Sequence, residues 1–414
     1  MKNLLKTLGP GILFASTAIG VSHLVQSTQA GANFGFTLLW AVLLANILKY
    51  PFFEFGSRYA NATGTSIIEG YKKLGNIPLI LYFLITLVSM FLVTAAVGYV
   101  TAGFFQNLFG IKSTVVAILL VFGSCIGFLI LNNFKVLDRL IKVTGIVLLL
   151  STLIAFVMVL FKGVQGNLDL WKIPKGSHTD YFAFILPLMG WMPTAVDLST
   201  WNSLWTVAKI KETGYHPKLK ETLFDFKFGY FASVLLSICF LTLGAFLMFG
   251  TPLVFTKSAG GFAAQVIDLY TSTFGSWATI IMTVSAFSIM FGTSLGVFDG
   301  YSRAMSEILR VSEISVFTSE SSQKNIYRIL LLIVGIGSFF LIYVFLDNPD
   351  GFKELVNLAT RISFLVAPVV AVSNWVLVQK KYVPKEFVPG TLLQVISAIG
   401  VLFLSVFTII YFIA

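Results

Sequence analysis

The feature that most constrains the fold is the apolar segment from Gly9 to Trp40, which has the length of a membrane helix but is interrupted near its middle. The interrupting residues are small or polar: Gly20, Ser22, His23 and Gln26. Lipid cannot hydrogen-bond free backbone groups, so a break is tolerated only where it is buried in protein or lines a cavity. Many transporters hold their substrate at such a break. The segment therefore predicts a membrane helix with a binding site at its centre.

Long apolar runs cover the chain and place it among polytopic helical membrane proteins. Of its 414 residues, 57% are hydrophobic and 11% are charged. A helix needs about twenty apolar residues to cross a bilayer, which predicts about eleven spans. They lie near residues 9–32, 36–60, 78–108, 113–133, 140–162, 181–206, 224–250, 276–303, 326–346, 354–379 and 388–413. The expected fold is all-α, with a single transmembrane domain over residues 1–414 in a lipid bilayer.

The net charge of +10 is explained by the loops between these spans. Basic residues gather on one predicted side, near residues 72–73, 135–142, 209–227, 303–328 and 380–385. The positive-inside rule then predicts a multi-pass protein of the cell membrane with a cytoplasmic N-terminus and an outer C-terminus. Because the cations lie in short loops, nucleic acid is not an expected partner. The two cysteines, both in apolar runs, indicate neither disulfides nor a thiolate metal site, and no cofactor is expected.

A second interrupted helix is expected in the sixth span. Pro187 and Pro193 lie within seven residues of each other, and a proline inside a helix removes a backbone hydrogen bond and clashes with the preceding turn. The helix is therefore expected to break over Gly190 to Thr194. The next acid, Asp197, has capping-box spacing from the threonine, which predicts that a new half-helix starts there.

Broken helices at positions one and six predict two inverted repeats of five helices each, with the substrate site at the bilayer midplane. The first repeat is expected over about 9–162 and the second over about 181–379, followed by an additional helix over about 388–413.

The sequence around both breaks resembles the NRAMP family of divalent-metal transporters. The resemblance rests on GPG at 9–11, QAGANFGFTLLW at 29–40 and the Met-Pro pair at 192–193, and it extends more weakly to QNLFG at 106–110 and to span ten. It implies a LeuT-like fold, with helices 1 and 6 discontinuous, and the activity of a secondary transporter.

The family's metal-binding groups are missing at the matching positions. Its first break reads Asp-Pro-Gly-Asn, with the acid and the amide as metal ligands, whereas Gly20 to His23 read Gly-Val-Ser-His. Its second break reads Met-Pro-His-Asn, whereas Met192 to Ala195 read Met-Pro-Thr-Ala, so only the methionine ligand is kept. The family's third-helix acids fall at Thr94 and Val97, and Arg361 takes or neighbours the place of a glutamine that helps bind metal.

These replacements predict a site for an anion. Without a carboxylate, a desolvated divalent cation would lack its largest stabilising interaction. The starts of the half-helices offer free N–H groups with partial positive charge, and the Arg361 guanidinium offers a fork of donors that matches an oxyanion. We therefore expect uptake of a small inorganic anion, bicarbonate first. The expected substrate-binding residues are Gly20, Ser22, His23, Trp191, Met192, Thr194 and Arg361.

The coupling ion is left open between sodium and protons. Thr293 and Ser294 in span eight are similar to the hydroxyl pair that binds sodium, together with carbonyls of the broken first helix, in sodium-coupled transporters of this fold. His23, Asp197 and Asp299 are candidates for proton coupling, and the histidine suits it because an imidazole titrates near neutral pH.

Several alternatives stay open at this point. Arg361 could snorkel to the interface or pair with Glu354, and Asp197 could be only a helix cap. The ion pairs expected among Lys49, Glu54 and Arg58 are interpreted as structural or gating.

The alternative function is a proton-coupled transporter of manganese or magnesium with a modified site. A membrane enzyme is disfavoured because the familiar catalytic motifs are lacking, and a non-transporting sensor because no inner loop is long enough for a soluble domain.

Overall fold

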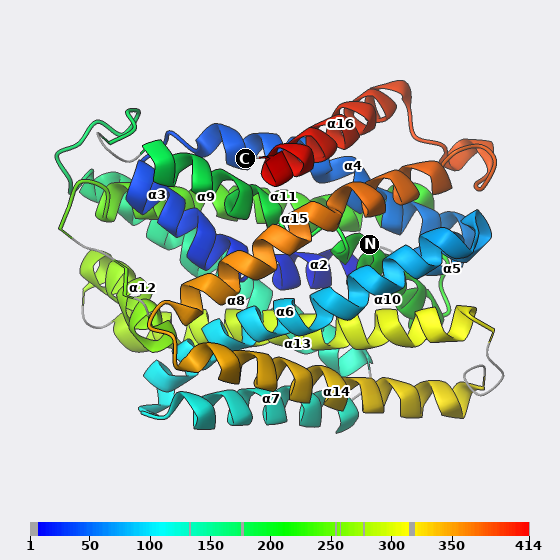
Figure 1. The fold of residues 1–414 in the computed structure, drawn as a ribbon, viewed down its shortest axis with the longest axis horizontal. Coiled ribbons are helices and arrows are strands. Elements are labelled where there is room, and N and C mark those ends of the chain that lie inside the picture. Colours follow the sequence, from blue (N-terminus) through cyan, green and yellow to red (C-terminus); the bar gives the residue numbers. More distant parts are fainter. Residues whose placement is uncertain are drawn as a thin grey trace.

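The computed structural model describes residues 7–131, 134–174, 178–252, 255–256, 258–275, 278–313 and 319–413. Every regular element in these ranges is a helix, so the predicted all-α fold is confirmed. The long helices run roughly along the longest axis of the molecule, with α12 toward one end of the bundle and α5 toward the other (Figure 1).

The helices follow the predicted spans closely. The first half of the chain forms α2 (Pro10–Ala18), η1 (Ser22–Ser27), α3 (Thr28–Phe34), α4 (Leu39–Thr63), α5 (Ile67–Leu74), α6 (Asn76–Phe109), α7 (Thr114–Leu131) and α8 (Phe134–Lys162). The second half forms α9 (His178–Gly190), α10 (Leu198–Thr213), α11 (Leu219–Leu247), α12 (Ala259–Phe274), α13 (Ala278–Val311), α14 (Glu320–Leu346), α15 (Gly351–Leu377), η3 (Lys385–Phe387) and α16 (Thr391–Ile413).

Within the described ranges, eight helices are long and apolar enough to cross a membrane: α6, α7, α8, α11, α13, α14, α15 and α16. The other predicted spans are the two broken helices and α4, which carries three charged residues, Lys49, Glu54 and Arg58. The predicted Glu54–Arg58 ion pair forms, with 2.6 Å between Oε1 and Nη2. Lys49 does not join this ion pair, because its ammonium donates to the carbonyls of Met189 and Gly190. The count of eleven spans stays a prediction.

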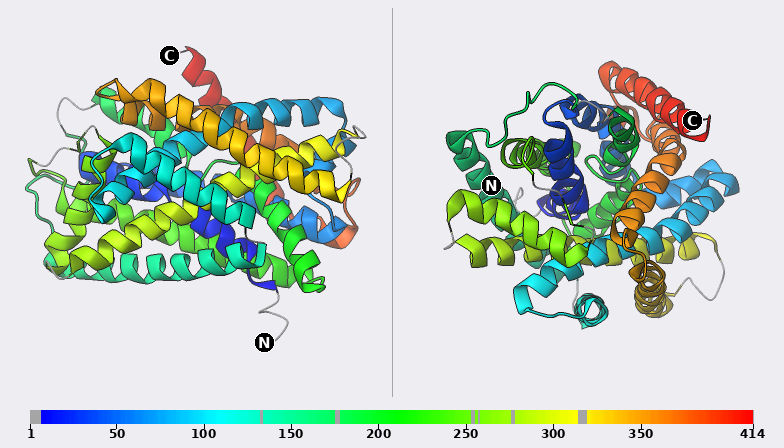
Figure 2. Two further views of the ribbon diagram at one scale, coloured as in Figure 1. Left: turned by 90° about the horizontal axis from the view of Figure 1, so that it is seen from below. Right: turned by 60° about the vertical axis from the view of Figure 1, so that its left-hand side comes forward.

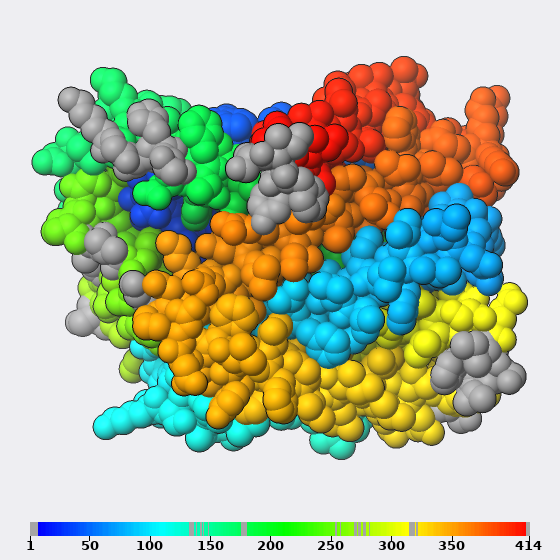
Figure 3. Space-filling model, viewed as in Figure 1, coloured from blue at the N-terminus to red at the C-terminus, as the bar shows by residue number. Residues whose placement is uncertain are grey.

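The half-helix α2 lies inside the bundle, where it packs against α8, α10, α11 and α13 (Figures 1 and 2). On the face shown in Figure 3, α6, α14 and α15 lie side by side across its front. The first broken helix is therefore buried in protein, as its free backbone groups require.

The start of α2 is fastened to α11. The Asp225 carboxylate accepts hydrogen bonds from the backbone N–H groups of Gly9 (3.0 Å) and Gly11 (2.6 Å), two donors that have no partner within a helix. A side chain on Gly11 or on Gly229 would collide with the backbone of the other helix, so the two helices cross at close range. The Asp225 carboxylate thus binds the start of α2, and the two glycines allow α2 and α11 to pack closely.

Candidate functional site

The first break lies at Ile19 and Gly20, between α2 and η1. The prediction of a broken first helix is confirmed. A side chain at residue 20 would collide with the Thr293 side chain of α13, which lies against the glycine. The Thr293 hydroxyl donates to the Ser16 carbonyl at 3.0 Å, and the Ile19 carbonyl lies 3.4 Å away. Glycine is needed in the break because α13 fills the space beside it.

The polar side chains of the first break bond to the protein. His23 is fully buried, with Nδ1 2.6 Å from Ser22 Oγ and Nε2 2.9 Å from the Ser233 carbonyl of α11. Ser22 Oγ also donates to the Ala18 carbonyl at 2.7 Å. Since both ring nitrogens are engaged, His23 can act as a ligand only if these hydrogen bonds break.

The second break runs from Trp191 to Asp197, between α9 and α10, and includes the predicted segment. The predicted capping box is wrong, because the side chain of Asp197, the N-cap residue of α10, makes no capping hydrogen bond. Instead, the Tyr301 hydroxyl of α13 donates to Asp197 Oδ2 at 3.2 Å. A buried carboxylate thus remains beside the second break, although the first break has lost its acid.

A cavity of about 20 Å³ lies where the two breaks meet, which is room for about one water molecule. We call it the central cavity. Four of the predicted site residues line it: Ser22, Trp191, Thr194 and Thr293. Thr17 and Tyr301 add hydroxyl groups, and the remaining lining residues are apolar: Ala18, Val21, Val93, Val97, Ala195, Leu198 and Val297. The central cavity suits a small ion with little hydration.

Five other predicted residues do not line the central cavity: Gly20, His23, Met192, Asp197 and Ser294. Gly20 packs against Thr293, as described above. Met192 is fully buried, and its Sδ lies 3.9 Å from Ser27 Oγ. Ser294 shares a hydrogen bond with Thr101 of α6 at 2.8 Å. The predicted hydroxyl pair is therefore divided, since Thr293 faces the first break and Ser294 faces α6.

Arg361 lines a different and larger cavity, about 560 Å³ in volume, which we call the α3 vestibule. Its polar and charged lining is Gln26, Gln29, Asn33, Asp180, Thr256, Asp350, Lys353, Asn357 and Arg361. Glu354, which the sequence offered as an ion-pair partner of Arg361, accepts a hydrogen bond from Asn348 at 2.7 Å. The structure therefore does not bring Arg361 together with the other predicted substrate residues.

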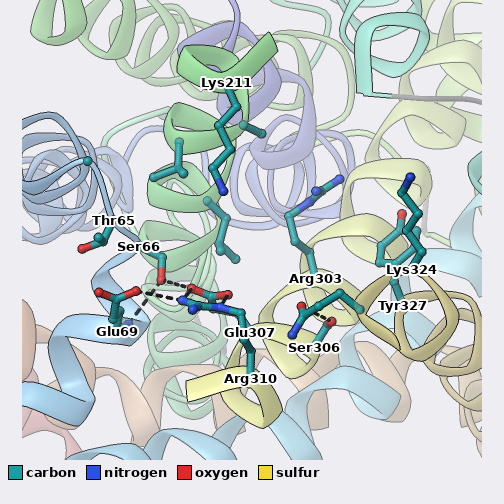
Figure 4. A pocket seen from close by; sticks show the side chains of 15 residues that line it. Thr65, Ser66, Glu69, Lys211, Arg303, Ser306, Glu307, Arg310, Lys324 and Tyr327 are labelled. Atoms are coloured by element: carbon teal, nitrogen blue, oxygen red, sulfur yellow. Dashed lines mark hydrogen bonds and ion pairs between the residues drawn. The ribbon is translucent and has the colours of Figure 1, made fainter. Parts of the chain in front are cut away.

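A cavity of about 620 Å³, the α5 vestibule, lies toward the α5 end of the bundle (Figure 4). Arg310 of α13 pairs with Glu69 of α5 at 2.8 Å and with Glu307 at 2.7 Å, and Ser66 donates to Glu307 at 2.6 Å. Arg303, which also lines it, pairs with Asp299 at 2.6 Å. Of these bonds, Arg310–Glu69 and Ser66–Glu307 tie α5 and its N-cap to α13, and the other two lie within α13.

Sequence reasoning missed the role of Lys49. Its side chain is completely buried, and its Nζ donates to the carbonyls of Met189 (2.6 Å) and Gly190 (2.9 Å), at the end of α9. Asp197 lies close enough to act electrostatically on the ammonium. An ionisable residue inside an apolar span is a functional candidate by default. The sequence spacing instead favoured a structural ion pair of Lys49 with Glu54 and Arg58.

No group of three or more histidine, cysteine, aspartate or glutamate side chains that could hold a metal ion occurs among the residues that the structure describes. Near the breaks, the donors include the Asp197 carboxylate, the Met192 thioether, several hydroxyl and carbonyl oxygens, and the His23 imidazole, whose nitrogens bond to Ser22 and Ser233. Such a set can bind a cation only with help from main-chain oxygens.

Membrane helices packed around two broken helices, with a cavity between the breaks and larger cavities toward both ends, have the arrangement of the LeuT-like fold. The chain belongs to the natural resistance-associated macrophage protein-like family, which it matches over residues 11–414. The predicted family, the multi-pass membrane protein and the absence of an enzymatic function are thereby confirmed.

The relatives cover nearly the whole chain. An uncharacterized protein of Pasteurella multocida (strain Pm70) is 33% identical, over 98% of this chain and 91% of its own length. The divalent metal cation transporter MntH of Listeria monocytogenes serotype 4a (strain HCC23) is 23% identical, over 99% of this chain and 89% of its own length.

Solved structures show the same fold. A mutant form of the Eremococcus coleocola manganese transporter superimposes with a TM-score of 0.75 and 13% identity, over 99% of this chain and 86% of its own. A sodium-coupled sialic acid symporter superimposes with a TM-score of 0.59 and 16% identity, over 97% of this chain and 88% of its own. The predicted LeuT-like fold is confirmed. The predicted anion cargo gains no support from these relatives, whose names favour the alternative of a divalent metal cation.

Proposed function

We propose that this protein is a secondary transporter of a divalent metal cation, manganese or magnesium, which passes through the central cavity by alternating access. The observation that carries the proposal is the family match over nearly the whole chain, together with a relative named as a divalent metal cation transporter that aligns over 99% of it. The α3 and α5 vestibules provide the two routes to the central cavity.

The ligands proposed for the metal come from both breaks and from α13. Asp197 provides the anionic oxygen and Met192 the thioether, and both are buried. Ser22, Thr194 and Thr293 provide hydroxyl oxygens in the central cavity. Divalent cations accept such a mixture of oxygen donors when at least one donor is anionic. The site is remodelled, because its acid stands at the second break and the first break has none.

We propose that one of two groups couples this transport to an ion gradient. The carbonyl oxygens of Ser16 and Ile19 lie 3.0 and 3.4 Å from the Thr293 hydroxyl, an arrangement of oxygens that suits sodium. Asp197 and Tyr301 form the buried acid and hydroxyl pair that suits a proton. Ser294 has no part in the sodium site proposed here, because it bonds to Thr101.

The topology proposed for this function has a cytoplasmic N-terminus and an outer C-terminus, with repeats over about 9–162 and 181–379. On this topology the α5 vestibule opens to the cytoplasm and the α3 vestibule opens outside. The basic residues that line the α5 vestibule support this orientation: Lys211, Arg303, Arg310 and Lys324.

Uptake of a small anion such as bicarbonate is the second candidate function, and one observation favours it. The buried Lys49 ammonium places a positive charge at the second break, where it would attract an anion and oppose a divalent cation. The half-helix N-termini at the two breaks add partial positive charge of the same sign.

Flux measurements in proteoliposomes separate the two functions. The purified protein is reconstituted into vesicles that hold either a manganese-sensitive dye or a pH-sensitive dye. We expect saturable manganese uptake that responds to an imposed proton or sodium gradient. Vesicles that take up no manganese, but whose internal pH changes when a bicarbonate gradient is applied, would overturn the metal proposal and favour the anion.

A further inference from the structure

The buried ammonium of Lys49 occupies a position that could otherwise hold a cation. The last carbonyls of a helix have no partner within the helix and carry partial negative charge. At the end of α9 these are the carbonyls of Met189 and Gly190, and both accept hydrogen bonds from Lys49 Nζ. The next residue, Trp191, lines the central cavity. Lys49 itself does not line the central cavity, but its ammonium bonds the two residues that directly precede Trp191.

The surroundings hold this ammonium in place. Nζ lies 5.9 Å from the centre of the Phe364 ring of α15, in the geometry of a cation–π contact. Asp197 at the start of α10 supplies the opposite charge nearby. Lys49 therefore bonds the end of α9 and lies within electrostatic range of the acid at the start of α10.

We propose that Lys49 is a tethered cation that determines which charge the central cavity accepts. The inference deepens the proposed function and rests on it, because both concern the same cavity. A metal ion at Asp197 would lie within electrostatic range of the ammonium, because Asp197 itself does, and two positive charges repel strongly in a buried site. Lys49 therefore limits the affinity for divalent cations and keeps their binding weak.

The alternative role for Lys49 is purely structural, as a clip between α4 and α9. The two roles differ in what a neutral side chain does. A structural clip that is removed destabilises the protein and leaves the affinity for a cation unchanged or lower. A tethered cation that is removed leaves two carbonyl oxygens and an unopposed carboxylate, which together form a better cation site.

The test measures binding of manganese alone to the full-length protein in detergent, by isothermal titration calorimetry. We expect Lys49→Met to bind manganese at least about tenfold more tightly than the wild type, because the local positive charge is gone. Lys49→Gln keeps hydrogen-bond donors for the two carbonyls and is expected to shift the affinity in the same direction, which guards against misfolding of the methionine variant. Lys49→Arg keeps the charge and is expected to retain wild-type affinity.

Lys209→Met is the matched control, because Lys209 is also a buried lysine but bonds Glu212 at the far end of α10. It removes the same net charge and is expected to leave the manganese affinity within about twofold of the wild type. Folded Lys49→Met and Lys49→Gln proteins with wild-type or weaker affinity would overturn the inference.

The outcomes also separate this inference from the proposed function. Manganese flux in the wild type, together with unchanged affinity in the Lys49 variants, overturns the inference and leaves the function standing. Absence of manganese flux in the wild type, together with tighter binding to Lys49→Met, overturns the function and supports the role of Lys49.

Discussion

The two breaks of this transporter differ in charge although they lie on either side of one cavity. At the first break the acid of the family is replaced by Gly20, and His23 is held by Ser22 and Ser233. At the second break, Lys49 bonds the end of α9 and Asp197 begins α10. The charged side chains that the structure places near the two breaks, Lys49 and Asp197, therefore both lie at the second break. Two breaks that border one cavity can thus differ in their charge.

The largest expected effect comes from the acid at the second break. Asp197→Asn keeps an oxygen that can accept the hydrogen bond from Tyr301 but removes the charge, so the fold is expected to survive. We expect manganese uptake to fall by about a hundredfold or more, since a buried cation loses its anionic ligand. Uptake into proteoliposomes measures the effect, and Asp169→Asn, in the exposed loop before α9, serves as the control. Wild-type uptake by Asp197→Asn would show that the second break does not bind the cargo.

A smaller effect is expected from adding a side chain at Gly20 in the first break. In Gly20→Ala, the new methyl group meets the Thr293 side chain, and overpacking of this kind costs about 1–3 kcal/mol. The variant should therefore melt at a lower temperature in detergent. Adding Thr293→Ala makes room for the methyl group and is expected to restore most of the lost stability. Equal melting temperatures for the wild type and Gly20→Ala would contradict the close contact between the first break and α13.

The fastening of α2 is expected to contribute a similar or slightly smaller amount. Asp225→Ala removes both acceptors at the start of α2, and loss of such a cap costs about 0.5–2 kcal/mol. Thermal unfolding of the purified protein measures the change, with Asp169→Ala as an exposed acid for comparison. If the two variants unfold at the same temperature, the carboxylate does not hold α2.

The smallest effect is expected at Arg361. Its side chain lines the α3 vestibule and not the central cavity, so Arg361→Gln removes a charge that solvent already screens in part. We expect the KM for manganese to change by less than about threefold. A tenfold change in KM would mean that Arg361 reaches the cargo in another conformation, as the sequence suggested.

The sequence was sufficient to predict the helical fold and both breaks, because proline, glycine and polar residues inside apolar spans leave few other structures in a membrane. It also identified Ser22, Trp191, Thr194 and Thr293, which line the central cavity. The first three are at or within a few positions of a break, so their place follows from the chain itself, and Thr293 was found through its resemblance to a known hydroxyl pair.

The sequence could not show which side chains turn away from the cavity. His23 adjoins the break but bonds to Ser233 on α11, and the Arg361 side chain on α15 lines the α3 vestibule and not the central cavity. Lys49 lies far from both breaks in the sequence and reaches the second only because α4 packs against α9. Such contacts depend on how distant helices pack, which spacing along one helix does not report. The sequence therefore drew attention to the charge of Arg361, whereas the positive charge at the second break belongs to Lys49.

The most direct test of the account is to locate the bound metal. Crystals of the full-length protein soaked in manganese are measured at a wavelength where manganese scatters anomalously. If the metal binds at Asp197 and Lys49 opposes it, the wild type shows one anomalous peak at the second break, in coordination contact with Asp197 and beside Met192. Lys49→Met shows a stronger peak at the same place. A peak only in the α3 or α5 vestibule, or no peak in either protein, would contradict the account.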